Sequence, residues 1–231
     1  MVNVLCLKHG TKYSADYVNK LFNMVQRHLT MPHRFVCFTD DPKNIADGIE
    51  IRMLPASNIK GWWWKPYVFK DDHFPKGDTN LFIDLDMVIV GNINNLINYL
   101  PGRFVGLRDV GRVFRPEYRK LGSAVMKWPS GEFSDIWSEF DKDSSIIRKF
   151  HGDQDWIWHR RKNDINFYPD EWIQSYKWEI RSKSELTGVG RGAKFSSVRN
   201  PEIPPNCSVL AFHGFPHLHD VQDPVILDNW Q

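Results

Sequence analysis

The apolar run Leu81–Val90, which reads LFIDLDMVIV, constrains the fold more than any other feature of the sequence. Its residue types are typical of a central strand buried on both faces of a parallel sheet. Asp84 and Asp86 interrupt the run, although burying an unpaired carboxylate is strongly unfavourable. We therefore expect a site that compensates both carboxylates, with Met87–Val90 either continuing the strand or forming a separate, shorter one beyond them.

Strands and helices alternate along the first half of the chain. Strands are predicted at Val2–Lys8, Arg34–Thr39, Ile49–Leu54 and Arg103–Leu107, and helices at Ser14–Leu29, within Gly61–Asp72 and at Asn92–Leu100. This rhythm predicts an α/β fold, a Rossmann-type, mostly parallel central sheet flanked by helices. The length of 231 residues suits one such domain. We expect a single domain over 1–231.

The second half of the chain is less regular. We predict an edge strand at Ser123–Trp128, a helix at Gly131–Phe150, a helix beginning within His151–Lys162 and a strand at Ser208–Phe212. The Gly-, Ser- and Lys-rich segment 182–197 is predicted to be a mobile loop.

Composition and charge restrict the class of protein. The net charge of +2 argues against nucleic-acid or membrane-surface binding, and ten Trp residues favour a binding surface in addition to a core. Cys6, Cys37 and Cys207 lie in or beside apolar runs, which predicts buried free thiols in a reducing compartment. No signal peptide or membrane-spanning run is recognisable. We expect a cytoplasmic protein; the oligomeric state stays open.

The two aspartates are candidate metal ligands. Ligands of open α/β sheets bind at the carboxyl ends of strands, where Asp84 and Asp86 are expected. Two residues apart on a strand, about 6–7 Å by strand rise, they share a face and repel each other. A hard cation such as Mg²⁺ or Mn²⁺ would resolve the repulsion. The alternative is a solvated structural role, because a D-x-D triplet alone is a weak signal and the chain contains two others, Asp141–Asp143 and Asp153–Asp155.

FIDLDMVIVGNINNL resembles the D-x-D segment of nucleotide-sugar glycosyltransferases of the GT-A fold, above all glycosyltransferase family 8, the glycogenin-like and lipopolysaccharide-galactosyltransferase-like group. LGSAVMKWP, GDQDWIWHR and VLAFHGFPHLHD resemble three further motifs of that family, in the family's order. The resemblance implies a GT-A-like domain that binds the nucleotide mainly with about 1–110 and the sugar and acceptor mainly with about 111–231.

The resemblance also implies roles for individual residues. Asp84, Asp86 and His213 match the metal ligands, although His213 could also be a structural histidine at a strand end. Asp153, Gln154 and Asp155 match the triplet near the donor sugar, where the transfer takes place; for Asp153 the alternative is a favourable acid at a helix N-terminus. The other implied substrate-binding positions are Leu85, Asp109, Gly122, Ser123 and Gly214.

The nucleotide is expected to lie over the ends of the first strands, at Lys8, His9, Gly10, Thr11 and Asp40. Lys65 either approaches the donor phosphates or extends from a surface helix into solvent.

The sequence departs from the family pattern in its C-terminal motif. The family has a phosphate-binding Lys where this chain has His217 and His219, and neutral histidines offer a phosphate less charge. Arg191 and Lys194 could supply charge from the Gly-rich loop. Leu121 stands where the family has Asn.

The predicted function is metal-dependent transfer of a sugar from a nucleotide-sugar donor, UDP-hexose above others, to a hydroxyl acceptor such as a glycan, with retention and with Mn²⁺ or Mg²⁺ as cofactor. One alternative is a metal-dependent nucleotidyl- or phosphotransferase, although KHGTKYS is a poor phosphate loop. The other is a non-catalytic sugar-binding protein that uses Trp faces, which leaves Asp84 and Asp86 unexplained.

Overall fold

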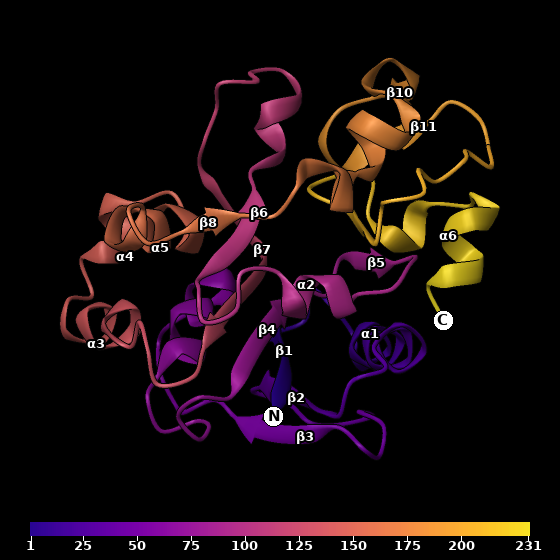
Figure 1. Ribbon diagram of the computed structural model, residues 1–231. Helices are drawn as coiled ribbons and strands as arrows, with labels where there is room; N and C mark the ends of the chain where they lie inside the picture. Colours follow the sequence, from indigo (N-terminus) through magenta and orange to yellow (C-terminus); the bar gives the residue numbers. More distant parts are fainter.

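A central sheet of seven strands organises the molecule, and the computed structural model describes all 231 residues of the chain (Figure 1). The strands lie in the order β3 (Glu50–Met53), β2 (His33–Thr39), β1 (Val2–Lys8), β4 (Thr79–Ile83), β7 (Leu121–Pro129), β6 (Val105–Arg108) and β8 (Asn166–Phe167). The first four are parallel to one another, and β8 is parallel to β6. Strand β7 is antiparallel to both its neighbours. The predicted α/β fold with a mostly parallel sheet is confirmed.

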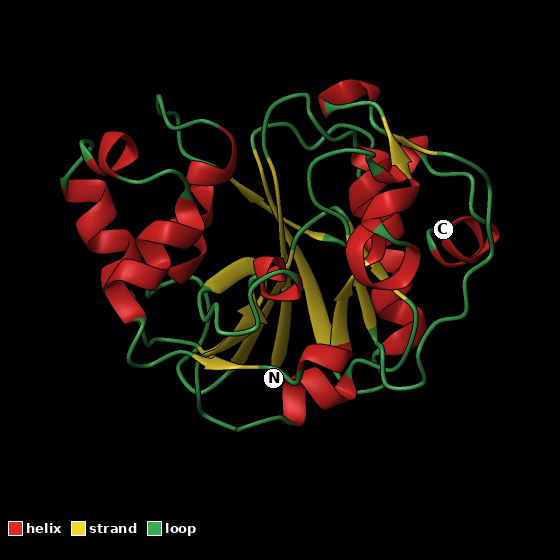
Figure 2. Cartoon of the chain, turned by 90° about the horizontal axis from the view of Figure 1, so that it is seen from above, coloured by secondary structure: helices red, strands yellow, loops and turns green.

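Helices cover both faces of this sheet (Figure 2). Alternate residues of a strand point to opposite faces, so Val4 and Cys6 of β1 enter one hydrophobic core while Leu5 enters the other. The α-helices are α1 (Ala15–His28), α2 (Asn94–Asn98), α3 (Asp135–Lys142), α4 (Ile146–Lys149), α5 (Asp153–Arg161) and α6 (Pro224–Asn229). Helices α1, α2 and α6 contribute to the first core, and α3, α4 and α5 to the second.

Several short helices complete the fold. The 3₁₀ turns are η1 (Gly61–Phe69), η2 (Val110–Val113), η3 (Asp170–Trp172), η5 (Lys183–Glu185), η6 (Gly190–Gly192) and η7 (Leu218–Asp220), and η4 (Tyr176–Arg181) is a π-helix. No helix combines the length and the hydropathy needed to traverse a lipid bilayer.

The run Leu81–Val90 passes from one sheet to another. Strand β4 ends at Ile83, and the next strand, β5 (Met87–Ile89), belongs to a three-stranded sheet with β12 (Val209–Ala211) and β9 (Ile173–Ser175). The split into two strands is therefore the correct alternative. The amide of Phe212 donates to the Asp86 carbonyl at 3.1 Å. The sheet change thus sets Asp84 and Asp86 beside the end of β12, which leads into His213.

Strands and helices of the first half are confirmed, whereas three predictions for the second half need correction. Strand β7 lies inside the sheet, between β4 and β6, and is not an edge strand. The predicted helix Gly131–Phe150 is interrupted between α3 and α4, where the Asp143 carboxylate accepts from the Ser145 amide at 2.9 Å. The Gly-rich segment forms a short hairpin of β10 (Leu186–Thr187) and β11 (Lys194–Phe195).

Candidate active site

A cleft of about 630 Å³ opens where the chain passes from the main sheet to the small one. Its walls come from the ends of β1, β4 and β12, from η1, from the start of β7 and from the start of α5. These segments are far apart in the sequence, and the carboxyl ends of β1 and β4 meet here because the two strands are parallel neighbours. The position agrees with the general location of ligand sites in open α/β sheets.

A buried lysine lies at the floor of the cleft. Lys65 of η1 is 4% exposed, and its Nζ lies 2.8 Å from Asp84 Oδ2 and 3.3 Å from Asp153 Oδ2. The same nitrogen donates to Ser123 Oγ at 3.1 Å, and Ser123 Oγ donates to Asp153 at 2.5 Å. Burial opposes the charge on Lys65, but Asp153 and Asp84 outweigh it and raise the pKa of Lys65 above its ordinary value. One ammonium is thus shared between two carboxylates.

The first aspartate of the D-x-D triplet is only partly neutralised. Burial raises the pKa of Asp84 above its ordinary value; Lys65 opposes this shift and the neighbouring Asp86 adds to it. Asp84 therefore has less compensating charge than a buried carboxylate needs.

The second aspartate is held by a tyrosine. Tyr13 donates its hydroxyl to Asp86 Oδ2 at 2.7 Å. Burial, together with the charge of Asp86, raises the pKa of Tyr13, so the phenol stays neutral and stays a donor. Leu85, between the two aspartates, is buried in the core and also borders the cleft. Both carboxylates line the cleft, at the turn between β4 and β5.

His213 lies in the wall formed by the end of β12. Its Nε2 is 2.8 Å from Ser175 Oγ, and its ring centroid is 4.2 Å from that of Trp178. Burial, and then the nearby Lys177, lower the pKa of His213 to about 3, so the imidazole is neutral. With Nε2 engaged by Ser175, Nδ1 is the nitrogen left to bind a ligand.

The donor set in the cleft fits a hard divalent cation. The charged residues of its lining are two lysines and four aspartates, a formal excess of two carboxylates: Lys12, Lys65, Asp84, Asp86, Asp109 and Asp153. Carboxylate oxygens with one imidazole suit Mn²⁺ or Mg²⁺. The side chains do not form a ready-made ligand cluster, because no three His, Cys, Asp or Glu groups converge on one point. Asp84, Asp86 and His213 share the cleft but would have to move together to bind one ion.

The opposite wall carries the predicted sugar-contacting residues. Asp153 and Gln154 begin α5 and line the cleft, as do Asp109 and Gly122. Gln154 Nε2 donates to Asp109 Oδ2 at 3.3 Å, and a Cβ at Gly122 would lie 3.3 Å from the Asp109 Cα. Glycine therefore permits the close approach of the two segments.

Some predicted residues do not reach the cleft. Asp155, Gly214, His217 and His219 are absent from its lining. His219 is instead engaged by Tyr17, whose hydroxyl lies 2.5 Å from His219 Nδ1. Lys8 is buried and donates to the Asp41 carbonyl at 3.1 Å.

Of the five positions predicted to bind the nucleotide, only His9, which follows β1, lines the cleft. The Gly10 amide donates to the Asp40 carboxylate at 3.1 Å, which orders this loop, and Thr11 is exposed. Asp40 thus acts on the loop that carries His9 and does not itself border the cleft.

Several cleft residues were not predicted from the sequence as donor-site residues, among them Lys12, Tyr13 and Trp62. Lys12 is exposed and has no ion-pair partner, and its Nζ lies 4.6 Å from the Tyr13 ring centroid. Lys12 and Tyr13 directly follow the predicted nucleotide segment, so extending that segment by two residues would have found them. Trp62 is 56% exposed, whereas its neighbours Trp63 and Trp64 are buried.

The fold is that of the GT-A glycosyltransferases. The sequence itself matches no protein-family model and no curated protein. Among solved structures, the galactosyltransferase LgtC in complex with donor and acceptor sugar analogs matches with a TM-score of 0.63 at 10% identity, over 94% of this chain and 88% of LgtC. An active-site mutant of LgtC matches with a TM-score of 0.67 at 10% identity, over 98% of this chain and 93% of LgtC.

A second glycosyltransferase, GlyE of Streptococcus pneumoniae, matches with a TM-score of 0.58 at 13% identity, over 74% of this chain and 45% of GlyE. The resemblance predicted from the four motifs is thus confirmed as a structural one.

Proposed function

We propose that this protein is a metal-dependent glycosyltransferase that transfers a hexose from a UDP-sugar to a hydroxyl acceptor with retention. One observation carries the proposal. The D-x-D aspartates, His213 and the Asp153–Gln154 pair come from distant segments and line one cleft of a glycosyltransferase-like fold. The lining also has two more carboxylates than ammonium groups, and a divalent cation would make it accept an anionic diphosphate.

Each wall has a proposed task. Asp84, Asp86 and His213 would hold Mn²⁺ or Mg²⁺, which supplies Lewis-acid stabilisation of the diphosphate leaving group. Lys12, the free cation of the lining, would bind a diphosphate oxygen. Asp153 and Gln154 would accept from and donate to the hydroxyls of the donor sugar. The nucleotide would lie over His9 at the end of β1.

Retention is implied by the resemblance to glycosyltransferase family 8, and the contacts of the carboxylates bear on the route by which it would occur. Asp153 accepts from Ser123 and pairs with Lys65, and Asp109 accepts from the Gly111 amide at 2.7 Å. Neither is free to act as a nucleophile, so we propose attack on the leaving-group side. The C1–O bond to the diphosphate breaks, the acceptor oxygen bonds to C1, and the acceptor proton passes to the departing phosphate oxygen.

The three cysteines agree with a reducing compartment. Cys6, Cys37 and Cys207 are free and buried. We propose that the protein acts in the cytoplasm.

Release of UDP tests the proposal. Purified protein is incubated with Mn²⁺ and a panel of nucleotide sugars, and free nucleotide is measured. We expect UDP release from one UDP-hexose, its loss on chelation, and its loss in Asp86→Ala. Asp141→Ala, at an exposed position of α3 that begins another D-x-D triplet, is the matched control. Unchanged turnover in Asp86→Ala contradicts the proposal, and pyrophosphate release from a nucleoside triphosphate would support nucleotidyl transfer instead.

A further inference from the structure

An aromatic surface continues from the cleft to the outside of the molecule. Trp178 lines the cleft beside His213, and its ring centroid lies 4.9 Å from that of Phe114 at an interplanar angle of 71°. Phe114 follows η2 in the loop between β6 and β7 and is 52% exposed. A single exposed aromatic side chain is ordinary, but one that extends the aromatic wall of a cleft is a ready platform for the C–H face of a sugar ring.

Cations without carboxylate partners lie beside Phe114 and in the loop that carries it. Lys183 Nζ lies 4.9 Å from the Phe114 ring centroid, and Arg115 and Lys120 lie 5.9 and 5.8 Å from the ring centroid of Tyr118. All three cations are exposed, and none takes part in an ion pair, although Glu117 lies in the same loop. The inside of the cleft is negative, whereas this outer rim, Phe114, Trp178, Arg115, Tyr118, Lys120 and Lys183, is positive.

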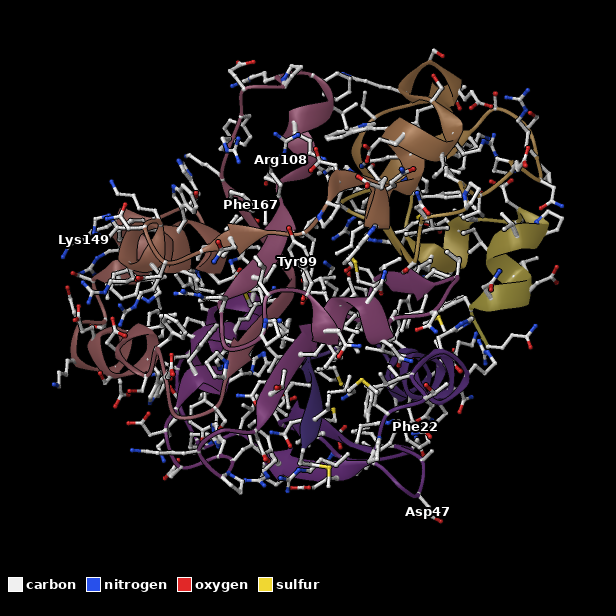
Figure 3. The ribbon with its side chains drawn as sticks, in the orientation of Figure 1. Phe22, Asp47, Tyr99, Arg108, Lys149 and Phe167 are labelled. Atoms are coloured by element: carbon white, nitrogen blue, oxygen red, sulfur yellow. The ribbon has the colours of Figure 1, made fainter.

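A buried arginine fixes the two halves of the rim to each other. Arg112 of η2 is 4% exposed; its guanidinium lies 3.1 Å from Asp170 and 3.1 Å from Glu179, and it donates to the Ile173 carbonyl at 3.0 Å. These partners belong to the segment that carries Trp178. Arg108, labelled in Figure 3 at the base of the same loop, also donates to Asp170, at 3.1 Å. The platform is therefore preorganised, which lowers the ordering penalty of binding.

We infer that the rim is the acceptor subsite and that the acceptor is an anionic saccharide, which stacks on Phe114 while its phosphate or carboxylate group pairs with Lys183 and Arg115. The inference rests on the proposed glycosyltransferase function. A neutral sugar would use the aromatic rings alone and would leave the cations unexplained. Pairing of lysine and arginine with an anionic group is a charge-assisted contact that also orients the acceptor toward the cleft.

Binding to immobilised oligosaccharides tests the inference without turnover. The intact protein is applied to an array of neutral, phosphorylated and uronate-bearing oligosaccharides, at low and at high salt. We expect retention on anionic members only, weaker at high salt, at least tenfold weaker in Phe114→Ala and about fivefold weaker in Lys183→Gln, since each removes one exposed contact. Preference between the phosphorylated and the uronate members identifies the anionic group.

Controls separate this inference from the proposed function. Lys162→Gln changes an exposed, unpaired lysine at the end of α5 and should bind like the wild type. UDP binding with Mn²⁺, measured by calorimetry, should be unchanged in Phe114→Ala and Lys183→Gln. Equal binding of neutral and anionic saccharides, no saccharide binding, or unaltered binding by both rim variants overturns the inference. Loss of UDP binding in the wild type would instead count against the proposed function.

Discussion

Lys65 Nζ lies 2.8 Å from the Asp84 carboxylate, within the wall of the cleft. The same ammonium is 3.3 Å from Asp153 of α5, so it joins the D-x-D segment to the helix that carries the predicted sugar-contacting pair. Lys65 thus links these two walls directly, and Ser123, which donates to Asp153, adds to the link. Lys65 is thus a structural residue of the site as well as a cleft residue.

Replacing Lys65 should destabilise the fold. Lys65→Met leaves two partly buried carboxylates without a counter-ion, and we expect the free energy of unfolding to fall by about 3 kcal/mol. Urea denaturation measures the change. Lys65→Met combined with Asp153→Asn should regain part of the loss, because one uncompensated charge is removed. A Lys65→Met protein as stable as the wild type would show that the ion pair is unimportant.

Tyr13→Phe should show how much the orientation of Asp86 matters, because it removes the hydrogen bond that holds the carboxylate and leaves the carboxylate itself in place. The lost hydrogen bond is neutral-to-charged and partly buried, so we expect about 1–2 kcal/mol less stability and a several-fold lower donor turnover at fixed Mn²⁺. Tyr67→Phe is the matched control, since Tyr67 packs against Trp137 outside the cleft. Equal turnover in the two variants would show that the Tyr13 hydroxyl does not contribute to donor turnover.

Asp135 should make stability depend on pH in the acid range. Although burial opposes its charge, hydrogen bonds from Arg161 and Arg160 lower the pKa of Asp135, and Arg160 Nη2 lies 2.9 Å from its carboxylate. A lowered folded pKa stabilises the protein above the unfolded pKa of about 3.9, and this stabilisation is lost as the pH falls through the folded value. We expect Asp135→Asn to lose about 1–2 kcal/mol at pH 7 and much less at pH 3.

Urea denaturation of both proteins at the two pH values measures this difference. Asp16→Asn is a suitable control, because the Asp16 side chain is exposed where it pairs with Lys20. The same loss of stability at pH 7 and pH 3 would contradict the electrostatic explanation.

Arg112→Met should loosen the rim more than it affects the donor site. The substitution leaves Glu179 and Asp170 with fewer partners, and we expect a loss of about 3 kcal/mol in unfolding free energy and faster proteolysis of the loop 109–120. Limited proteolysis followed by mass spectrometry checks this. Cleavage at the wild-type rate would show that Arg112 does not hold the loop.

Strands β1, β2 and β4 could be predicted because two-sided burial leaves a nearly continuous apolar pattern in each of them. The position of β7 inside the sheet could not be predicted in this way. Lys127 suggests an edge strand, yet it is buried and its Nζ donates to the Ile97 and Leu100 carbonyls at 3.2 Å, at the end of α2. These acceptors are about thirty positions away in the chain, and no local pattern reports them.

The candidate site also contains residues that could be predicted from the sequence and residues that could not. Asp84, Asp86 and His213 were predictable because charged or polar residues follow apolar strands. Lys12 directly follows the predicted nucleotide segment and could have been included in it. That Trp62 lines the cleft while Trp63 and Trp64 are buried depends on how the start of η1 folds. The sequence likewise cannot show that His219 is engaged by Tyr17 and stays out of the cleft.

The most direct measurement is a crystal structure of the protein with Mn²⁺ and UDP, with data collected at the manganese absorption edge. We predict one anomalous peak within about 2.2 Å of an Asp86 carboxylate oxygen, a typical metal–oxygen distance, with Asp84 and His213 drawn to the same ion and the uridine over His9. An anomalous peak away from Asp86, or UDP bound outside the cleft, would contradict the account.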